Sequence, residues 1–179
     1  MLPQIGEMRP WADPTITQIN RLPIHTPIKR DEKISLNGSW SFELFSHPDD
    51  VQESVLTNLQ NQKHVDVPGN WTMQDTGDFP HYTNVQMPFD GSPPDLPKKI
   101  TTGVYRRKFS VPADWQTSQT VLNIGGAESV HAVYLNGKFV GYGTDSRLPS
   151  EYDISKYLLE GENILAVVVI RYSAMSYIE

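Results

Sequence analysis

The residues from Gly141 to Asp153 hold the densest group of side chains that could do chemistry. The stretch contains two glycines, three acidic residues and an arginine. Asp145, Glu151 and Asp153 could supply the two carboxyl groups of a glycoside hydrolase, which lie about 5 to 10 Å apart. However, Glu151 and Asp153 lead into a short strand and could simply accept hydrogen bonds from turn amides. We therefore expect a functional loop that contains no catalytic residues.

Two side chains have both a structural and a ligand-binding interpretation. Asp145 lies at the mouth of this loop, where it is either the carboxylate of an Asx turn or a ligand for a bound molecule. Asn84 is either a turn residue or a hydrogen-bonding amide directed at a ligand. Arg147 is either an exposed cation or a residue that fixes the shape of the loop.

Several kinds of catalytic site are excluded by the residues that the chain lacks. It has no cysteine, no Gly-X-Ser-X-Gly segment and no glycine-rich phosphate loop. The histidines are scattered, with no pair at the i, i+4 spacing of a helical zinc site. They are His25, His47, His64, His81 and His131. We expect neither a histidine-based metal centre nor a cysteine nucleophile.

The composition is that of a soluble globular chain. Of its 179 residues, 38% are hydrophobic and 20% are charged, and the formal net charge is -6. A negative charge disfavours nonspecific binding to nucleic acid or to anionic membranes, because both require clustered positive charge. The sequence shows no signal peptide and no apolar run of about 20 residues that could span a membrane. We expect a cytoplasmic protein with no nucleic-acid or membrane partner.

The chain divides into an arm, residues 1–33, and a domain, residues 34–179. The arm contains five prolines, which interrupt helices and strand ladders. Its apolar residues are too numerous for a solvated linker, so the arm lies either along its own domain or along another subunit. These residues are Trp11, Ile16, Ile19, Leu22 and Ile24.

Most of the domain has the patterns of β-strands. Apolar residues alternate from 39 to 44, and strands are also expected at 64–67, 104–111, 120–124, 130–135, 138–142 and 163–171. Asn136 and Gly137 favour a type I′ hairpin turn. The arginines and lysine of 104–111 favour an edge position for that strand. The unbroken aliphatic run Ile164 to Ile170 indicates burial on both faces of a sheet.

Two other segments lack a strand pattern. Residues 49–59 have a helical spacing of apolar residues, which predicts one short helix. Residues 69–102 form a long irregular excursion that is rich in proline and aromatic residues. A short strand or a helical turn is expected at 152–159. Short strands separated by turns predict an all-β fold, a jelly-roll β-sandwich with an extended N-terminal arm.

Several segments together resemble the N-terminal part of bacterial lac-type β-galactosidases of glycoside hydrolase family 2. They occur in the same order as in that family and extend over residues 11–179. The segments are WADPTITQINRL (11–22), LNGSWSF (36–42), VPGNWTM (67–73), YTNV (82–85), TGVY (102–105), YLNGKFVGY (134–142) and DSRLPSEYD (145–153). Residues 1–10 and much of 75–101 match no pattern of the family.

The resemblance implies a fold and a function. In the family, the first domain is a jelly-roll, galactose-binding-domain-like sandwich that packs on a TIM barrel. The barrel supplies both catalytic glutamates of a retaining mechanism, so this chain alone is expected to be inactive. The first domain completes the galactosyl subsite for β-galactosides such as lactose. By resemblance, Asp145 binds the galactosyl group and a sodium ion, and Asn84 reaches the same subsite.

The resemblance also implies partners and cofactors. The other ligands of the sodium ion would come from the domain that is absent here, and the full enzyme of the family also admits magnesium. The remaining domains are expected partners, and the full-length enzyme is expected to be a homo-oligomer in which residues 11–28 take part in subunit contacts. Two other hypotheses are a free-standing carbohydrate-binding module and a purely structural domain.

Overall fold

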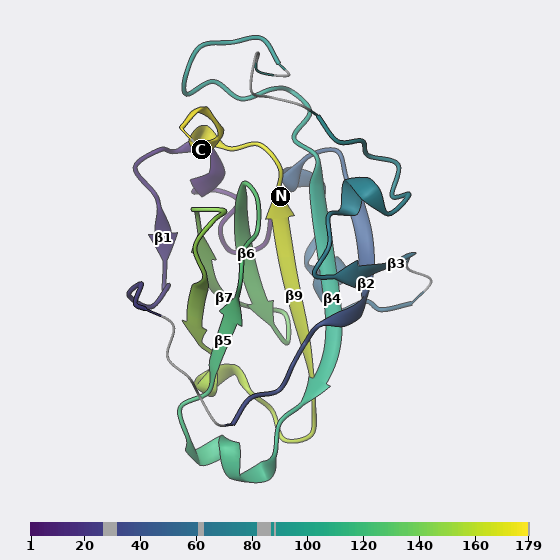
Figure 1. Ribbon diagram of the computed structural model, residues 1–179, viewed down its shortest axis with the longest axis vertical. Helices are drawn as coiled ribbons and strands as arrows, with labels where there is room; N and C mark the ends of the chain where they lie inside the picture. Colours follow the sequence, from purple (N-terminus) through teal and green to yellow (C-terminus); the bar gives the residue numbers. More distant parts are fainter. Residues whose placement is uncertain (27–31, 61–62, 82–86, 88, 179) are drawn as a thin grey trace.

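The computed structural model is an all-β sandwich (Figure 1), and it describes residues 1–26, 32–60, 63–81, 87 and 89–178. The predicted fold class is confirmed. The larger antiparallel sheet contains seven strands in the order β1-β7-β6-β9-β4-β2-β3, and the smaller contains β5 and β8. The strands are β1 (Gln18–Ile19), β2 (Gly38–Phe45), β3 (Lys63–Val67), β4 (Thr102–Ser110), β5 (Val121–Ile124), β6 (Val130–Leu135), β7 (Lys138–Gly143), β8 (Ser150–Asp153) and β9 (Glu162–Ile170).

The large sheet has apolar side chains on both faces, as the aliphatic run in β9 predicted. Leu165, Val167 and Val169 belong to one hydrophobic cluster, together with residues of β5 and β8. The residues between them along β9, such as Ala166 and Val168, belong to a second cluster on the opposite face. Because successive side chains of a strand point to opposite faces, a strand buried on both sides must be apolar throughout.

The N-terminal arm packs on its own domain. Leu2, Ile5 and Trp11 are at most 2% exposed and form part of the second cluster. Further along, β1 pairs with β7, where Gln18 lies opposite Gly143. The arm therefore covers one face of the large sheet and extends it by a strand, which is one of the two packing alternatives. A subunit contact through residues 11–28 stays a prediction, as does the domain boundary at residue 33.

The hairpin of β6 and β7 forms as predicted. Asn136 and Gly137 have φ angles of 54° and 77°, which are the left-handed values that a type I′ turn requires at both central positions. The Asn136 side chain also donates to the backbone oxygen of Tyr157, at 3.0 Å, and accepts from the backbone N–H of Ile164, at 2.9 Å. The turn thus holds the hairpin against β9.

The predicted edge position of β4 is wrong. β4 lies between β9 and β2, and its Arg106 side chain is fully buried. The guanidinium pairs with Glu43 at 3.2 Å and donates to the backbone oxygen of Val55 at 2.7 Å, which offsets part of the cost of burying the charge. Both partners lie more than 50 positions away in the sequence, so the local pattern could not reveal them.

The expected helix at 49–59 is replaced by two short 3₁₀ turns, and the described residues contain no α-helix. Pro48–Asp50 and Glu53–Leu56 form η2 and η3, which place Val51 and Leu56 in the core. The other 3₁₀ turns are η1 (Pro10–Ala12), η4 (Trp71–Met73), η5 (Ala113–Thr117), η6 (Ser155–Tyr157) and η7 (Ala174–Tyr177). Within the described ranges, no helix is long and apolar enough to cross a membrane.

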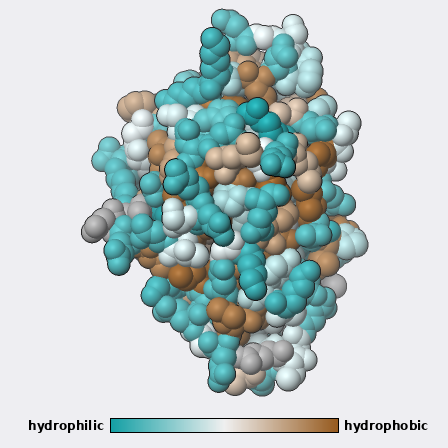
Figure 2. Space-filling view, turned by 180° about the vertical axis from the view of Figure 1, so that it is seen from behind, coloured by the Kyte–Doolittle hydropathy of each residue, from teal (hydrophilic) through white to brown (hydrophobic). Residues whose placement is uncertain are grey.

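The face opposite to that of Figure 1 is mostly hydrophilic (Figure 2). Apolar residues reach this surface in separate patches and do not form one continuous area. This is the usual surface of a folded domain, in which single exposed apolar side chains are common.

Candidate functional site

Asp145 lies in the loop between β7 and β8, in a conformation that keeps one carboxylate oxygen available. Its Oδ1 atom accepts the backbone N–H groups of Arg147, at 3.2 Å, and Leu148, at 3.3 Å. Its φ angle is 75°, a left-handed value that aspartate tolerates better than most residues. The side chain is half-buried, and Oδ2 makes no hydrogen bond with the described residues. Asp145 is therefore an Asx-turn residue whose second carboxylate oxygen is not used by the turn.

The N-terminal arm holds both ends of this loop. The backbone N–H and the Oγ1 atom of Thr144 donate to the backbone oxygen of Thr17, at 3.1 and 3.0 Å. Arg21 donates from Nη1 to the backbone oxygen of Thr144, at 2.8 Å, and approaches Oγ of Ser150 at 3.5 Å. The backbone N–H of Leu22 donates to the backbone oxygen of Glu151, at 2.8 Å. Because Thr144 and Ser150 flank the loop, one guanidinium spans its base.

A buried histidine and a buried tyrosine contact each other next to the two strands that flank the loop. The Oη atom of Tyr152 lies 2.9 Å from Nε2 of His131. Burial, together with the nearby charge of Arg21, lowers the pKa of His131 to about 4, so the imidazole is neutral at pH 7. Burial also raises the pKa of the Tyr152 phenol. A Cβ atom at Gly143 would lie 2.7 Å from Tyr152 Oη, so any larger residue there would displace the phenol.

The other two acids of the stretch have separate contacts. Glu151 lies 2.9 Å from Nε2 of His25 and accepts from Nδ2 of Asn123 at 3.1 Å. Asp153 accepts the backbone N–H and the hydroxyl of Ser155, and these hydrogen bonds lower the pKa of its carboxyl group. Both carboxylates thus hold neighbouring segments of the fold.

Of the two predicted site residues, the structure describes only Asp145. Asn84 lies outside the described residues, so its relation to Asp145 stays a prediction. Arg147 is exposed, and its backbone N–H contacts Asp145. Among the described residues, no group of three histidines or acids could hold a metal ion. Asp145 Oδ2 fits the role of a single oxygen ligand for a hard cation, with the other ligands from elsewhere.

Arg21 and His131 were not identified as site residues from the sequence. Arg21 lies in the WADPTITQINRL segment, which was a signal for the family and not for a contact with the loop. His131 lies in an apolar strand, and no sequence pattern links it to Tyr152, 21 positions later. Both roles depend on the pairing of β1 with β7 and on the stacking of the two sheets.

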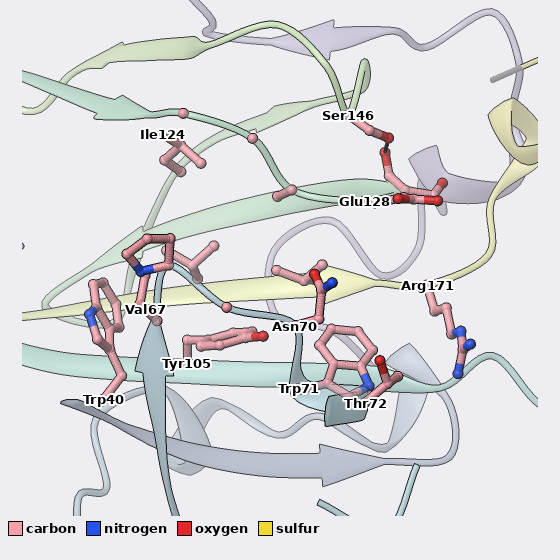
Figure 3. Close-up of a pocket in the computed structure, with 18 of the residues that line it drawn as sticks. Trp40, Val67, Asn70, Trp71, Thr72, Tyr105, Ile124, Glu128, Ser146 and Arg171 are labelled. Atoms are coloured by element: carbon pink, nitrogen blue, oxygen red, sulfur yellow. Dashed lines mark hydrogen bonds between the residues drawn. The ribbon is translucent and has the colours of Figure 1, made fainter. Parts of the chain in front are cut away.

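A separate hollow of about 740 Å³ lies on the face of the large sheet near β5 (Figure 3). Trp40, Tyr105 and Trp71 line one part of it, and Ile124 and Glu128 line the opposite side. Asp145 is not among the lining residues, although its neighbour Ser146 is. Among the described residues, the lining of this hollow therefore does not include the predicted sugar ligand.

Residues 34–179 match the sequence profile of the sugar-binding domain of glycosyl hydrolases family 2. The chain belongs to this family. The matched residues include every strand except β1, together with the Asp145 loop, and they exclude the N-terminal arm. The family thus agrees with the fold and with the resemblance of the individual segments.

Curated relatives of this sugar-binding domain are β-galactosidases. The β-galactosidase of Aeromonas hydrophila is 40% identical over 201 residues, which cover 100% of this chain and 20% of that protein. The β-galactosidase of Lactococcus lactis is 41% identical over 176 residues, which cover 97% of this chain and 18% of that protein. The chain therefore spans about a fifth of the length of these relatives.

Solved structures of β-glucuronidases share the fold of this sugar-binding domain. The structure of Bifidobacterium dentium β-glucuronidase, complexed with coumarin-3-O-glucuronide, aligns with a TM-score of 0.59 at 28% identity. That alignment covers 80% of this chain and 21% of the other. The Lactobacillus rhamnosus β-glucuronidase aligns with a TM-score of 0.63 at 20% identity, over 82% of this chain and 22% of the other.

Proposed function

We propose that this chain is the sugar-binding domain of a β-galactosidase, and that it completes the galactosyl subsite without catalysing hydrolysis itself. The observation that carries the proposal is the 40% identity with β-galactosidases over the full length of the chain. The β-glucuronidase structure at 20% identity supports the fold alone. The proposed substrates are terminal β-D-galactosides such as lactose.

Asp145 is the proposed sugar ligand within the described part of the chain. A neutral sugar offers only hydroxyl groups, and a carboxylate oxygen accepts hydrogen bonds from them strongly. Oδ1 is already occupied by two backbone N–H groups, which leaves Oδ2 for the sugar or a cation. Asn84 is the proposed second ligand, where an amide can both donate to and accept from hydroxyl groups.

A sodium ion would share this site. Asp145 would contribute one oxygen ligand, and the rest of the protein would contribute the others. The ion, when bound, supplies positive charge that orients sugar hydroxyl groups. The protein's own part is to hold the carboxylate in place, through the Asx turn and the Arg21 contacts at the base of the loop. Magnesium is a further proposed ion of the whole enzyme.

The proposed hydrolysis proceeds with retention of configuration, using two carboxyl groups about 5 to 5.5 Å apart outside this chain. One would attack the anomeric carbon and the other would protonate the leaving oxygen. In this scheme the domain orients the galactosyl group by binding, and it transfers no proton. The parent protein is proposed to be a cytoplasmic homo-oligomer.

Calorimetry separates this split site from a free-standing carbohydrate-binding module. Methyl β-galactoside would be titrated into the 179-residue chain. We expect no measurable heat of binding, because one wall of a pocket cannot desolvate a neutral sugar. The same chain, replacing the matching region of the L. lactis β-galactosidase, should yield an enzyme that hydrolyses lactose. Millimolar or tighter binding by the isolated chain would favour the carbohydrate-binding module instead.

A further inference from the structure

The hollow near β5 is a groove between the two sheets, and its floor is apolar. Trp40, Tyr105, Val167 and Val169, which come from β2, β4 and β9, contribute to this floor. They are between 6% and 9% exposed, whereas most of the core is exposed by 2% or less. The core side chains that keep some exposure to solvent thus lie mainly along this groove.

One wall of the groove is β5, whose second edge pairs with no strand of the described residues. β5 pairs only with β8 among the described strands. The backbone N–H of Ile154 donates to the oxygen of Thr120 at 2.9 Å, and hydrogen-bonded pairs alternate along an antiparallel ladder. The backbone groups of Leu122 therefore point towards β8, and those of Val121 and Asn123 point to the free edge. An unpaired edge of this kind is a template for another strand.

The groove also offers polar groups at its sides. The Tyr105 side chain lies on its floor, and Asn70 projects into the groove from the wall opposite β5 (Figure 3). The described residues provide no hydrogen-bond partner for the Tyr105 hydroxyl. The backbone of an added strand could supply a carbonyl to this hydroxyl, while its alternate side chains cover the apolar floor.

We propose that this groove receives a β-strand from another part of the parent protein, which pairs with the free edge of β5. A two-stranded sheet is marginal by itself, and a third strand would bury the residual exposure of the floor. About four-fifths of each β-galactosidase relative lies outside the matched region. A corresponding region of the parent protein could therefore supply the strand. The inference rests on the chain being part of a longer protein and not on the identity of the bound sugar.

Peptide binding to the 179-residue chain tests this inference. Peptides of about 20 residues would be tiled across the parts of the A. hydrophila and L. lactis β-galactosidases that this chain does not match. We expect one segment with alternating apolar residues to bind, and to slow amide hydrogen exchange at Val121 and Asn123. Binding by no peptide would overturn the proposal. So would binding that leaves these two amides unprotected.

A pair of variants at one position supplies the control. Asn123→Pro removes the N–H that points to the free edge, and it leaves the groups of β5 that pair with β8 in place. Asn123→Ala loses the same side-chain contact with Glu151 but keeps that N–H. The proline variant should bind the peptide at least roughly tenfold more weakly than the alanine variant. Equal affinities would contradict strand addition.

Two other occupants are distinguished in the same experiment. If methyl β-galactoside alone protected Val121 and Asn123 from exchange, the groove would be a sugar site, and the proposal would be wrong. Dimerisation of the isolated chain through β5 would show as concentration-dependent protection without peptide, and it too would overturn the proposal. A failed peptide test leaves the Asp145 experiment unaffected, because the groove does not include Asp145.

Discussion

At the scale of single residues, Asp145 has a structural role through Oδ1, and the proposed function adds a binding role for Oδ2. Oδ1 closes the turn, and Oδ2 makes no hydrogen bond with the described residues, so one substitution can separate the two roles. Asparagine retains an oxygen at the Oδ1 position and also tolerates the positive φ angle, whereas alanine does neither. Asp145→Asn is therefore the more informative variant for binding, and Asp145→Ala for the loop itself.

His131 predicts how stability depends on pH. Its pKa in the folded chain is about 4, below the ordinary value of 6.5. The unfolded chain therefore binds more protons between these pH values, and stability falls as the pH drops through this window. The loss should be on the order of 3 kcal/mol in the free energy of unfolding. Urea unfolding at pH 7, 5.5 and 4.5 measures it.

His131→Asn is the control for this pH effect. It removes the titrating imidazole, while the carboxylates that titrate below pH 5 stay in place. The variant should lose less stability than the wild type between pH 7 and 4.5. Parallel pH profiles for the two proteins would show that the imidazole does not carry the effect.

At the scale of elements, the arm is part of the sandwich and should contribute to its stability. Trp11 is 1% exposed within the core cluster, and replacing a buried tryptophan by alanine costs about 3 to 5 kcal/mol. Met8, on the same arm, is 53% exposed, so Met8→Ala should change stability by less than about 0.5 kcal/mol. Urea unfolding of both variants tests this. Similar small effects would mean that the arm is not anchored.

Elements with local signals could be predicted from the sequence, and those with distant partners could not. The Asn136–Gly137 turn and the aliphatic run of β9 are specified by neighbouring residues, and both form as expected. The position of β4 depends on Glu43 and Val55, which neutralise and bind Arg106 from distant parts of the chain. The prediction of a short helix was wrong because two separate 3₁₀ turns place the apolar residues of 51–56 in the core.

The candidate site shows the same limit. Asp145 was predicted as a ligand because it lies in a short, acid-rich loop that carries a family pattern. The Arg21 contacts at the base of that loop arise from pairing between β1 and β7, which brings together residues more than 120 positions apart. The buried His131–Tyr152 contact likewise depends on the stacking of the two sheets. Local sequence predicts a candidate loop, whereas the contacts that hold this loop depend on tertiary pairing.

At the scale of the whole molecule, the chain matches only part of the length of its relatives. It covers 20% of the A. hydrophila β-galactosidase and 18% of the L. lactis β-galactosidase. Asp145 Oδ2 makes no hydrogen bond with the described residues, and the groove beside β5 has a strand edge that pairs with no described strand. In the proposals above, both surfaces meet partners from the rest of a longer protein, so activity should be measured in a complete enzyme.

The most direct test uses the chimera in which this chain replaces the matching region of the L. lactis β-galactosidase. Asp145→Asn should lower kcat/KM for lactose by roughly 10- to 150-fold, the effect of losing a hydrogen bond to a charged group, and should weaken any sodium dependence. Asp153→Asn, another capping aspartate, is the matched control and should leave kcat/KM within about twofold, since surface substitutions are usually mild. Full activity in the Asp145→Asn chimera would contradict the proposed sugar-binding role.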